Sequence, residues 1–443
     1  LGLAYQAQGK FADAQNAYEQ ALSLAEEIGR REFLPHAHYR LGDLLRHRQK
    51  REEALKHFEA AVAIIEETRK PLQEEEIKIS LLGRWQQIYE ALVLLCLELG
   101  REQDAFHWSE RARSRAFSEG VQNQTRPAEV VTLADVQAQL NGQTAIVNYF
   151  TTGVLENDIP LLRAIPKENV LRDHLLTTAD VIMFIITADE FTAERRFFNP
   201  NVLLTNTQRG YDPRRFLSPK IHQSLSPIVL PQLKEHIRNV TLIPHGPLHQ
   251  VPFAVLFEVQ PQVLLSYAPS VTIWNSLQQQ EPREIPTLSR LMNSDSQREC
   301  LAIAYRGETR SGSDRKLNYV EKEASAVAQL MDGDAWVGGM MSKANLQFQA
   351  SGTRWLHFAC HGWFNHDKPL SSALEIGPNE RLTADEILRH WDLRAELVTL
   401  SACQTGVSRV LRGDEPMGLV RAFLYAGARS VLVSQWPVED LPT

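Results

Sequence analysis

Two residues towards the end of the chain have the chemistry of a nucleophile and its base. An apolar run that starts at Trp355 ends at His361, and a second run that starts at Leu397 ends at Cys403. A cysteine thiolate is a strong nucleophile, and an imidazole within reach of the thiol activates it. Either residue alone would carry little weight, because a single cysteine is usually a small buried hydrophobe. Together they indicate a cysteine-dependent reaction.

A parallel sheet is expected to position these two residues. Three runs of strand length alternate with two helix-like segments, in the order Trp355–Cys360, Thr383–His390, Leu397–Ala402, Pro416–Tyr425 and Ser430–Trp436. Such alternation predicts a parallel sheet, and functional residues gather beyond the carboxyl ends of its strands. Thr383 and Glu386 have the spacing of a capping box for the first helix. Pro416 favours the first turn of the second helix, which Gly427 can end.

Three motifs in this part of the chain, Trp355–Gly362, Leu397–Gly406 and Gly427–Asp440, resemble in their order those of the CHAT family. That family comprises caspase- and separase-like domains that are commonly attached to tetratricopeptide repeats. The resemblance covers most of residues 130–443. It implies a caspase-like fold and a cysteine endopeptidase that cleaves a protein substrate.

The resemblance also implies a role for each residue of the site. His361 would be the general base and Cys403 the nucleophile. The backbone N–H groups of Gly362 and Cys403 would form the oxyanion hole, whose donors are each worth about 10²–10³ in rate. A glycine suits this place because it lets the backbone come close to a substrate carbonyl.

Two further stretches resemble the substrate-binding parts of caspase-like enzymes. Asp414 follows the cysteine by eleven residues, on the loop that shapes the substrate pocket in those enzymes, so we expect it to bind a basic or polar side chain. The other interpretation of Asp414 is the N-cap of the next helix, with Glu415 complementing the helix dipole. Ser434, Gln435 and Trp436 resemble the strand end along which the substrate backbone lies. Trp436 is then either a pocket wall or a core residue.

The segment from Cys403 to Arg409 permits a rival interpretation. It reads C-x-x-G-x-x-R, the loop with which cysteine phosphatases hold phosphate at a helix N-terminus. Ala402 stands where such phosphatases have a histidine, and Asp414 and Glu415 would repel a phosphate dianion at the next helix. A cysteine-dependent phosphatase is therefore the weaker alternative.

No cofactor is expected. Cys360, His361, His366 and Cys403 could be grouped as zinc ligands, but their spacing matches no usual ligand pattern, so no metal site is predicted. The chain contains neither GxGxxG nor a GxxxxGK motif, and nucleotide binding has no support. Cys360 should point to the opposite side of its strand from His361 and pack in the core, and His357 is interpreted as structural.

The N-terminal part of the chain reads as a helical repeat. Six positions recur 40 residues later: Leu1, Gly2, Tyr5, Ala14, Tyr18 and Ala21 match Leu41, Gly42, Leu45, Ala54, Phe58 and Ala61. A third, less regular copy holds Leu92, Val93, Ala105, Ser109 and Ala112. The pattern resembles tetratricopeptide repeats, of which about three copies make a stable stack. The stack would either bind a protein or peptide on its concave face or brace the next domain.

The expected organisation is multidomain: an all-α repeat region, then an α/β caspase-like region with a mainly parallel sheet. Its predicted parts are repeats at 1–119, a linker at 120–142, an inactive caspase-like half at 143–280, a linker at 281–298 and the active half at 299–443. The resemblance supplies the two halves. The chain is expected to begin within a repeat and to end before a last helix of the active half. His245 and His249 of the first half are interpreted as structural residues at the interface between the halves.

Four short apolar runs in the first half predict strands: Thr144–Phe150, Val181–Thr187, Val240–Pro244 and Val263–Tyr267. A helix is predicted at Lys220–Ile237. In the second half, Cys300–Tyr305 predicts a strand, and an amphipathic helix should follow from Leu317 to Met331.

Composition limits the compartment and the partners. A net charge of −7 over 443 residues, without a Lys/Arg block, gives no sign of direct nucleic-acid binding. Four irregularly spaced cysteines form no disulfide framework, which favours a reducing cytoplasm, and a bacterial source is expected. No apolar run is long enough to span a membrane. The expected partners are a protein substrate and a regulatory or recruiting protein on the repeats.

We expect a latent enzyme that is controlled or targeted through its repeats. Two long polar segments, Trp363–Leu382 and Gln404–Glu415, are predicted to be loops that become ordered when a partner binds. A non-catalytic signalling adaptor is the alternative from another functional class. Intact His361, Gly362 and Cys403 argue against it, because an adaptor has no chemical need for all three.

Overall fold

The computed structural model describes residues 1–71, 85–113, 130–153, 180–197, 216, 218–257, 263–279, 299–307, 317–338, 342–365, 367–402, 409–411 and 415–434. The chain divides into two compact units. The first comprises Leu1–Ala116, Ala128–Asn275 and Arg412–Glu415, and the second comprises Phe117–Pro127, Ser276–Leu411 and Pro416–Thr443. None of the described helices is long and apolar enough to cross a membrane.

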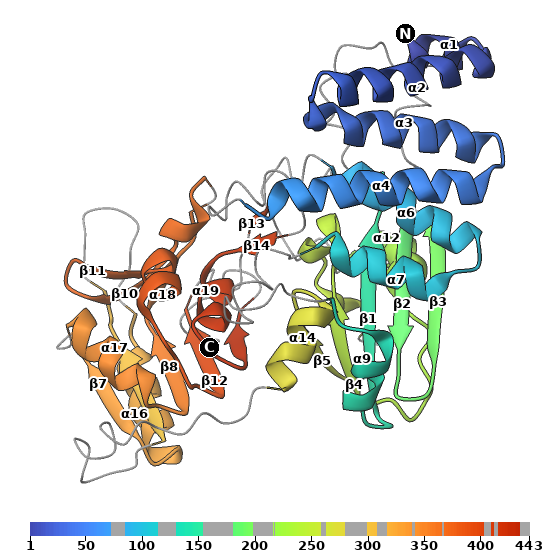
Figure 1. The fold of residues 1–443 in the computed structure, drawn as a ribbon. Helices are drawn as coiled ribbons and strands as arrows, with labels where there is room; N and C mark the ends of the chain where they lie inside the picture. The colour runs from blue at the N-terminus through green and yellow to red at the C-terminus, as the bar shows by residue number, and fades with distance from the viewer. Residues whose placement is uncertain are drawn as a thin grey trace. The chain divides into compact units, whose positions relative to one another are not determined.

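The first unit begins with three helical hairpins, as the repeat pattern predicts (Figure 1). Their helices are α1 (Gly2–Ala7), α2 (Phe11–Glu27), α3 (Leu34–His47), α4 (Arg51–Arg69), α6 (Gln86–Glu98) and α7 (Glu102–Arg111), with the 3₁₀ turn η1 (Arg31–Phe33) before α3. The turn inside each hairpin uses a residue with positive φ, namely Gly9, Gln49 and Gly100. Consecutive helices lie side by side in the stack.

The recurring glycines allow the two helices of a hairpin to pack closely. A β-carbon on Gly2 would lie 2.4 Å from the ring of Tyr18, and one on Gly42 would lie 2.7 Å from the ring of Phe58. Both rings are buried. The small and large residues that recur in the sequence are therefore packing partners, and this confirms the repeat interpretation.

A mixed five-stranded sheet, sheet A, follows the repeats in the first unit. Its strands are β1 (Thr144–Thr151), β2 (Asp180–Ile186), β3 (Phe191–Phe197), β4 (Asn239–Ile243) and β5 (Leu264–Tyr267). The spatial order is β3-β2-β1-β4-β5. β1, β4 and β5 are parallel to one another, β2 pairs antiparallel with β1, and β3 pairs antiparallel with β2. Four of these strands were predicted from apolar runs. β3 was not, because its sequence is largely polar and its residues are partly exposed.

In the described residues, five short helical segments accompany sheet A: α9 (Leu133–Gln139), α12 (Pro219–Val229), η5 (Gly246–Gln250), α13 (Phe253–Leu256) and α14 (Val271–Gln278). α9 lies within the stretch that was expected to be a linker. α12 ends at Val229, so the predicted helix Lys220–Ile237 was too long. Leu230, which precedes Pro231, is already extended, as expected for a residue before proline.

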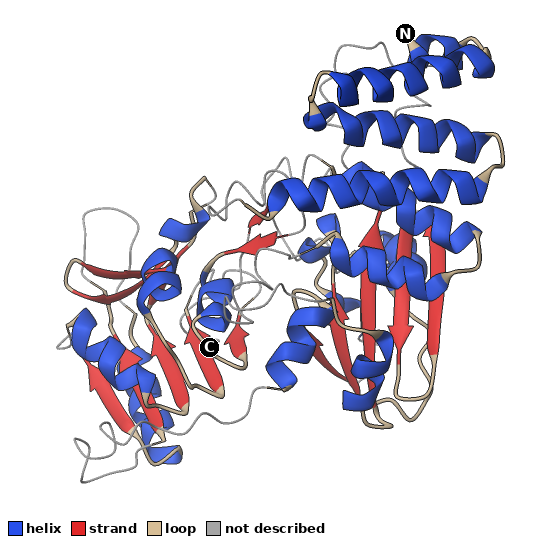
Figure 2. Cartoon of the chain, viewed as in Figure 1, coloured by secondary structure: helices blue, strands red, loops and turns tan. Residues whose placement is uncertain are grey.

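The second unit contains a fully parallel sheet, sheet B (Figure 2). Its strands are β6 (Cys300–Ala304), β7 (Asp334–Val337), β8 (Trp355–Ala359), β12 (Leu397–Ser401) and β15 (Val431–Val433), in the order β15-β12-β8-β6-β7. The helices are α16 (Val320–Leu330), α17 (Lys343–Ser351), α18 (Ala384–His390) and α19 (Leu419–Tyr425). α16 packs on one face of the sheet, and the other three share a core with the opposite face. The predicted β-α-β-α-β order is confirmed.

The caps of α18 and α19 differ in how well they were predicted. Thr383 and Glu386 form the predicted capping box, with Thr383 N–H donating to Glu386 Oε2 at 2.8 Å. α19 starts at Leu419 after the N-cap Gly418, whereas Pro416 lies in β14 (Glu415–Met417). The predicted start at Pro416 was therefore wrong. Gly427, with a φ of 109°, follows the C-cap as predicted.

A small antiparallel sheet, sheet C, occupies the segment that was predicted to be a loop between Trp363 and Leu382. It consists of β9 (His361–Trp363), β10 (Ala373–Gly377) and β11 (Glu380–Thr383), in the order β11-β10-β9. Leu374, Ile376 and Leu382 are buried in the core of the second unit. The loop prediction was wrong here, because alternate residues of this polar segment are apolar anchors.

Candidate active site

His361 lies just beyond the carboxyl end of β8, where the sequence predicts it. It is the first residue of β9 and is half-buried. Cys403 itself lies outside the described residues, but β12 ends at Ser401, two residues before it. β8 and β12 are adjacent and parallel, and Ala359 pairs with Ser401. The chain therefore leaves two neighbouring strands at the same level of the sheet, one towards His361 and the other towards Cys403.

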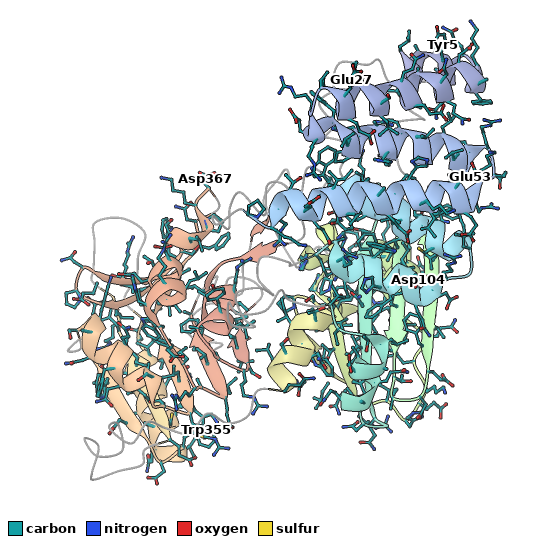
Figure 3. All side chains as sticks on the ribbon, in the orientation of Figure 1. Tyr5, Glu27, Glu53, Asp104, Trp355 and Asp367 are labelled. Atoms are coloured by element: carbon teal, nitrogen blue, oxygen red, sulfur yellow. The ribbon has the colours of Figure 1, made fainter. Side chains whose placement is uncertain are left out.

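The amino end of β8 lies at the opposite end of the strand from His361. Trp355 begins β8 and is labelled in Figure 3. The guanidinium of Arg354 lies 4.6 Å from the centre of its ring. Because β8 runs from Trp355 to Ala359, this aromatic residue marks the amino end of the strand, away from His361.

One face of sheet C packs on the hydrophobic core of the second unit, and His361 lies on the other face. Gly362 pairs with Leu374, so it belongs to the row that faces the core. His361 pairs with Glu375, and Glu375 pairs with Arg381, so these three residues form a row on the open face. Trp363 lies on the same face because it is two residues from His361. Trp363 is 46% exposed, so solvent reaches this face two residues from the candidate base.

His361 was identified from the sequence, but its neighbours on this open face, Trp363, Glu375 and Arg381, were not. Arg381 lies over the ring of Trp363, with 5.7 Å between its guanidinium carbon and the ring centre. Glu375 has no charged neighbour within four positions in the sequence that would draw attention to it. The only sequence signal was the alternation of Leu374, Ile376 and Leu382 with polar residues, which would have predicted half-buried strands.

His357 and Ser401 are joined to helix α16 through Glu323. Nε2 of His357 lies 3.0 Å from Oε1 of Glu323. Burial alone would raise the pKa of Glu323, but hydrogen bonds from His357 and Ser401 outweigh it and hold this pKa below its usual value. The interpretation of His357 as a structural residue is confirmed.

Cys360 is unsuited to act as the nucleophile. Its side chain is completely buried in the core of the second unit, as predicted from the alternation along β8. Burial raises the pKa of this thiol well above its usual range. The other described cysteines, Cys96 and Cys300, are also buried, and burial raises their pKa values too. A thiol with a raised pKa is a poor nucleophile, so Cys403 remains the candidate.

His245, which was interpreted as a structural residue, has partners in sheet A and in the repeats. It is buried, its ring is tilted against that of Phe150 with 4.5 Å between the centres, and its Nδ1 accepts a hydrogen bond from Thr151 N–H at 3.1 Å. Its Nε2 lies 3.4 Å from Nε2 of Gln86 in α6. These contacts join sheet A to the repeats. His249 lies in η5.

Of the predicted substrate-binding residues, the structure describes only Ser434. Its hydroxyl donates to the carbonyl of Ala402 at 3.2 Å. This bond joins the residues that follow β15 and β12, next to Cys403. Asp414, Gln435 and Trp436 lie outside the described residues.

The helix-based interpretations of the Cys403–Glu415 segment do not hold. The N-cap of α19 is Gly418, so Asp414 does not cap it. Arg409 begins a short strand, β13 (Arg409–Leu411), which pairs with β14. A phosphatase loop leads directly into a helix whose N-terminus binds the phosphate, and a strand stands at that place here.

The described residues contain no group of three or more His, Cys, Asp or Glu side chains that could hold a metal ion. His366, one of the four residues considered as zinc ligands, lies outside the described part of the chain, as does Cys403. Within the described part, the site offers an imidazole, backbone N–H groups and the open face of sheet C.

Comparison with protein families identifies the class of protein. The CHAT domain matches residues 216–443, which is more than half of the chain, and a tetratricopeptide repeat matches residues 1–67. The chain belongs to the CHAT family, a caspase-like family, and joins a CHAT domain to tetratricopeptide repeats. The search of curated proteins found no match.

Proposed function

We propose that this protein is a cysteine endopeptidase in which Cys403 is the nucleophile and His361 the general base. The observation that carries this proposal is the pairing of Ala359 with Ser401 on adjacent parallel strands. It brings the exits of β8 and β12 to one level, with His361 two residues beyond the first partner and Cys403 two residues beyond the second. Membership of a caspase-like family supports the same assignment.

The reaction would follow from these positions. The imidazole of His361 takes the proton of Cys403, and the thiolate attacks the scissile carbonyl. The N–H groups of Gly362 and Cys403 would stabilise the oxyanion. The imidazolium then protonates the leaving amine, and water hydrolyses the thioester. Ser434 contributes by tying the segment before Cys403 to the end of β15.

We propose that substrate binding uses the segments on either side of this centre. Ser434, Gln435 and Trp436 would pair with the substrate backbone as an added strand. Asp414 would bind a basic or polar side chain next to the cleaved bond. The N-cap of α19 is Gly418, and this supports a role for Asp414 in the pocket over helix capping.

The repeats would bind a recruiting or regulatory protein, and the enzyme would be latent until that partner binds. A repeat stack changes curvature when its concave face is filled. The cytoplasm is the compartment that suits this proposal, because its reducing conditions keep a catalytic thiol active.

The test uses a diverse peptide library with cleavage read by mass spectrometry. Cys403→Ala and His361→Ala should each abolish cleavage without additive effects, because nucleophile and base act as one unit. Asp414→Asn should change the residue preferred next to the cut. Cleavage that survives in either dyad variant would refute the assignment. Absence of cleavage and of labelling by a peptide-linked thiol electrophile, with the partner present, would favour the adaptor.

A further inference from the structure

The imidazole of His361 lies against a glycine that comes from another strand of sheet B. Gly307 follows β6 and has a φ of +77°. A β-carbon added to Gly307 would lie 2.7 Å from Cδ2 and 2.8 Å from Nε2 of His361. Atoms in contact are normally about 3.5–4.0 Å apart. The ring therefore occupies the space that any side chain at residue 307 would need.

The backbone before Gly307 is held in place. The N–H of Tyr305 donates to the carbonyl of Ala359 at 3.1 Å, which continues the pairing of β6 with β8. Arg306 makes two hydrogen bonds with Leu317: its carbonyl accepts from Leu317 N–H at 3.0 Å, and its Nε donates to Leu317 O at 3.3 Å. The segment that leads into Gly307 is thus attached both to the strand that precedes His361 and to the residues before α16.

We propose that Gly307 is a positioning residue for the imidazole of His361. Its backbone, which carries no side chain, lies against the edge of the ring that contains Nε2. This contact limits the orientations that the ring can adopt. A β-carbon at this place would displace the ring, and a displacement of about 1 Å in a reacting group can cost roughly 10²-fold in rate. The effect on catalysis rests on the proposed function, whereas the contact between the two residues does not.

Gly338 provides a matched control. It follows β7, the strand next to β6, and has a φ of +75°. Its N–H donates to the carbonyl of Ala304 at 3.2 Å. A β-carbon on Gly338 would meet nothing within 4 Å. Alanine at either glycine introduces the strain of positive φ, but only at residue 307 does it also overlap with the imidazole.

The first measurement separates the contact from backbone strain. Gly307→Ala and Gly338→Ala are made in the full chain, alone and combined with His361→Ala. Strain should lower the melting temperature by about 2–8 °C in both single variants. The overlap with the imidazole should lower the melting temperature further at residue 307 only. Combining the variant with His361→Ala should remove that additional decrease. If Gly307→Ala does not fold, recovery of folding in the double variant carries the same test.

The second measurement reports on the imidazole itself. The rate at which iodoacetamide alkylates Cys403 is followed by mass spectrometry across the pH range in which thiols and imidazoles titrate. In Gly307→Ala this rate should fall about 10–100-fold near neutral pH, and its pH profile should approach that of His361→Ala. Gly338→Ala should match the unaltered protein, because its strain lies away from the ring.

The outcomes distinguish this proposal from the proposed function. If His361→Ala changes the profile but Gly307→Ala behaves as Gly338→Ala does, the positioning role is overturned and the endopeptidase assignment stands. If His361→Ala leaves the profile unchanged with a partner bound to the repeats, the proposed function fails. In that case the melting temperatures test the contact. Non-additive changes in Gly307→Ala and His361→Ala support a contact between the two residues, and additive changes overturn it.

Discussion

At the scale of single residues, Glu323 joins three elements that surround the candidate site. It belongs to α16 and binds His357 of β8 and Ser401 of β12. His357 is buried and Ser401 is partly buried. Glu323→Ala would leave both partners without this carboxylate, at an expected cost of about 1–3 kcal/mol in the free energy of unfolding. Glu323→Gln keeps a hydrogen-bonding group of the same shape and should cost less.

The same carboxylate predicts a dependence on pH. Because the pKa of Glu323 is lowered in the folded state, the stability it contributes is fully present above the usual carboxyl pKa of about 4.3 and is lost as the pH falls below that value. Melting temperatures measured from neutral to acidic pH should therefore fall less steeply in Glu323→Gln than in the unaltered protein. Parallel curves would show that Glu323 is not held ionised by folding.

At the scale of elements, the third repeat reverses the packing of the first two. Gly42 faces the buried ring of Phe58, whereas the matching positions of the third hairpin hold Val93 and Ser109, both fully buried. The larger residue has moved from the second helix of the hairpin to the first. This exchange preserves volume, which explains how the less regular copy still packs.

This exchange can be transferred to the second repeat. Gly42→Val should destabilise the stack by about 1–3 kcal/mol, because its side chain overlaps the ring of Phe58. Phe58→Ser should destabilise it by leaving a cavity. The double variant should be more stable than the sum of the two losses predicts, and thermal unfolding of all four proteins measures this coupling. Strict additivity would mean that the two positions do not share one space.

Local patterns predict the elements that carry the candidate dyad, but not the sheet that His361 begins. The runs that form β8 and β12 are mostly apolar, and two residues, Thr383 and Glu386, are enough to form the capping box of α18. Sheet C has strands of only three to five residues, so the alternation of Leu374, Ile376 and Leu382 with polar residues is a weak signal that was taken for a loop. Gly307 was beyond prediction, because its role depends on a contact with a residue 54 positions later.

At the scale of the whole molecule, the repeats and sheet A share one hydrophobic core. The ring of Phe106 in α7 packs edge-on against Phe184 of β2, with 5.8 Å between their centres. The two were predicted as separate domains at 1–119 and 143–280. No local pattern reveals this union, because the residues that form it are scattered over both segments.

Buried polar groups strengthen the same junction. Glu110 in α7 accepts hydrogen bonds from Thr272 N–H at 2.9 Å and from Nδ2 of Asn148 at 3.1 Å. Arg113 donates to the backbone carbonyls of Tyr149 and Pro244. All of these side chains are buried. Loss of the third hairpin would expose or orphan each partner on sheet A, at a cost that grows with every buried polar group left unpaired.

Because the repeats and sheet A share one core, the choice of truncated chain decides how control through the repeats can be tested. A chain that starts at residue 120 lacks Phe106, Glu110 and Arg113, and we expect its first unit to be unfolded or aggregated. A chain that starts at residue 31 lacks only the first hairpin, whose stability depends on its neighbour in the stack, and we expect it to fold. Circular dichroism and limited proteolysis check both expectations. A cooperative transition in the chain from residue 120, at the melting temperature of the full chain, would contradict the first expectation.

The rate of Cys403 labelling should therefore be compared between the full chain and the chain from residue 31, with and without the partner. A rise in labelling on partner binding that requires the first hairpin would support control through the repeats, and equal rates would leave them a recruiting role alone.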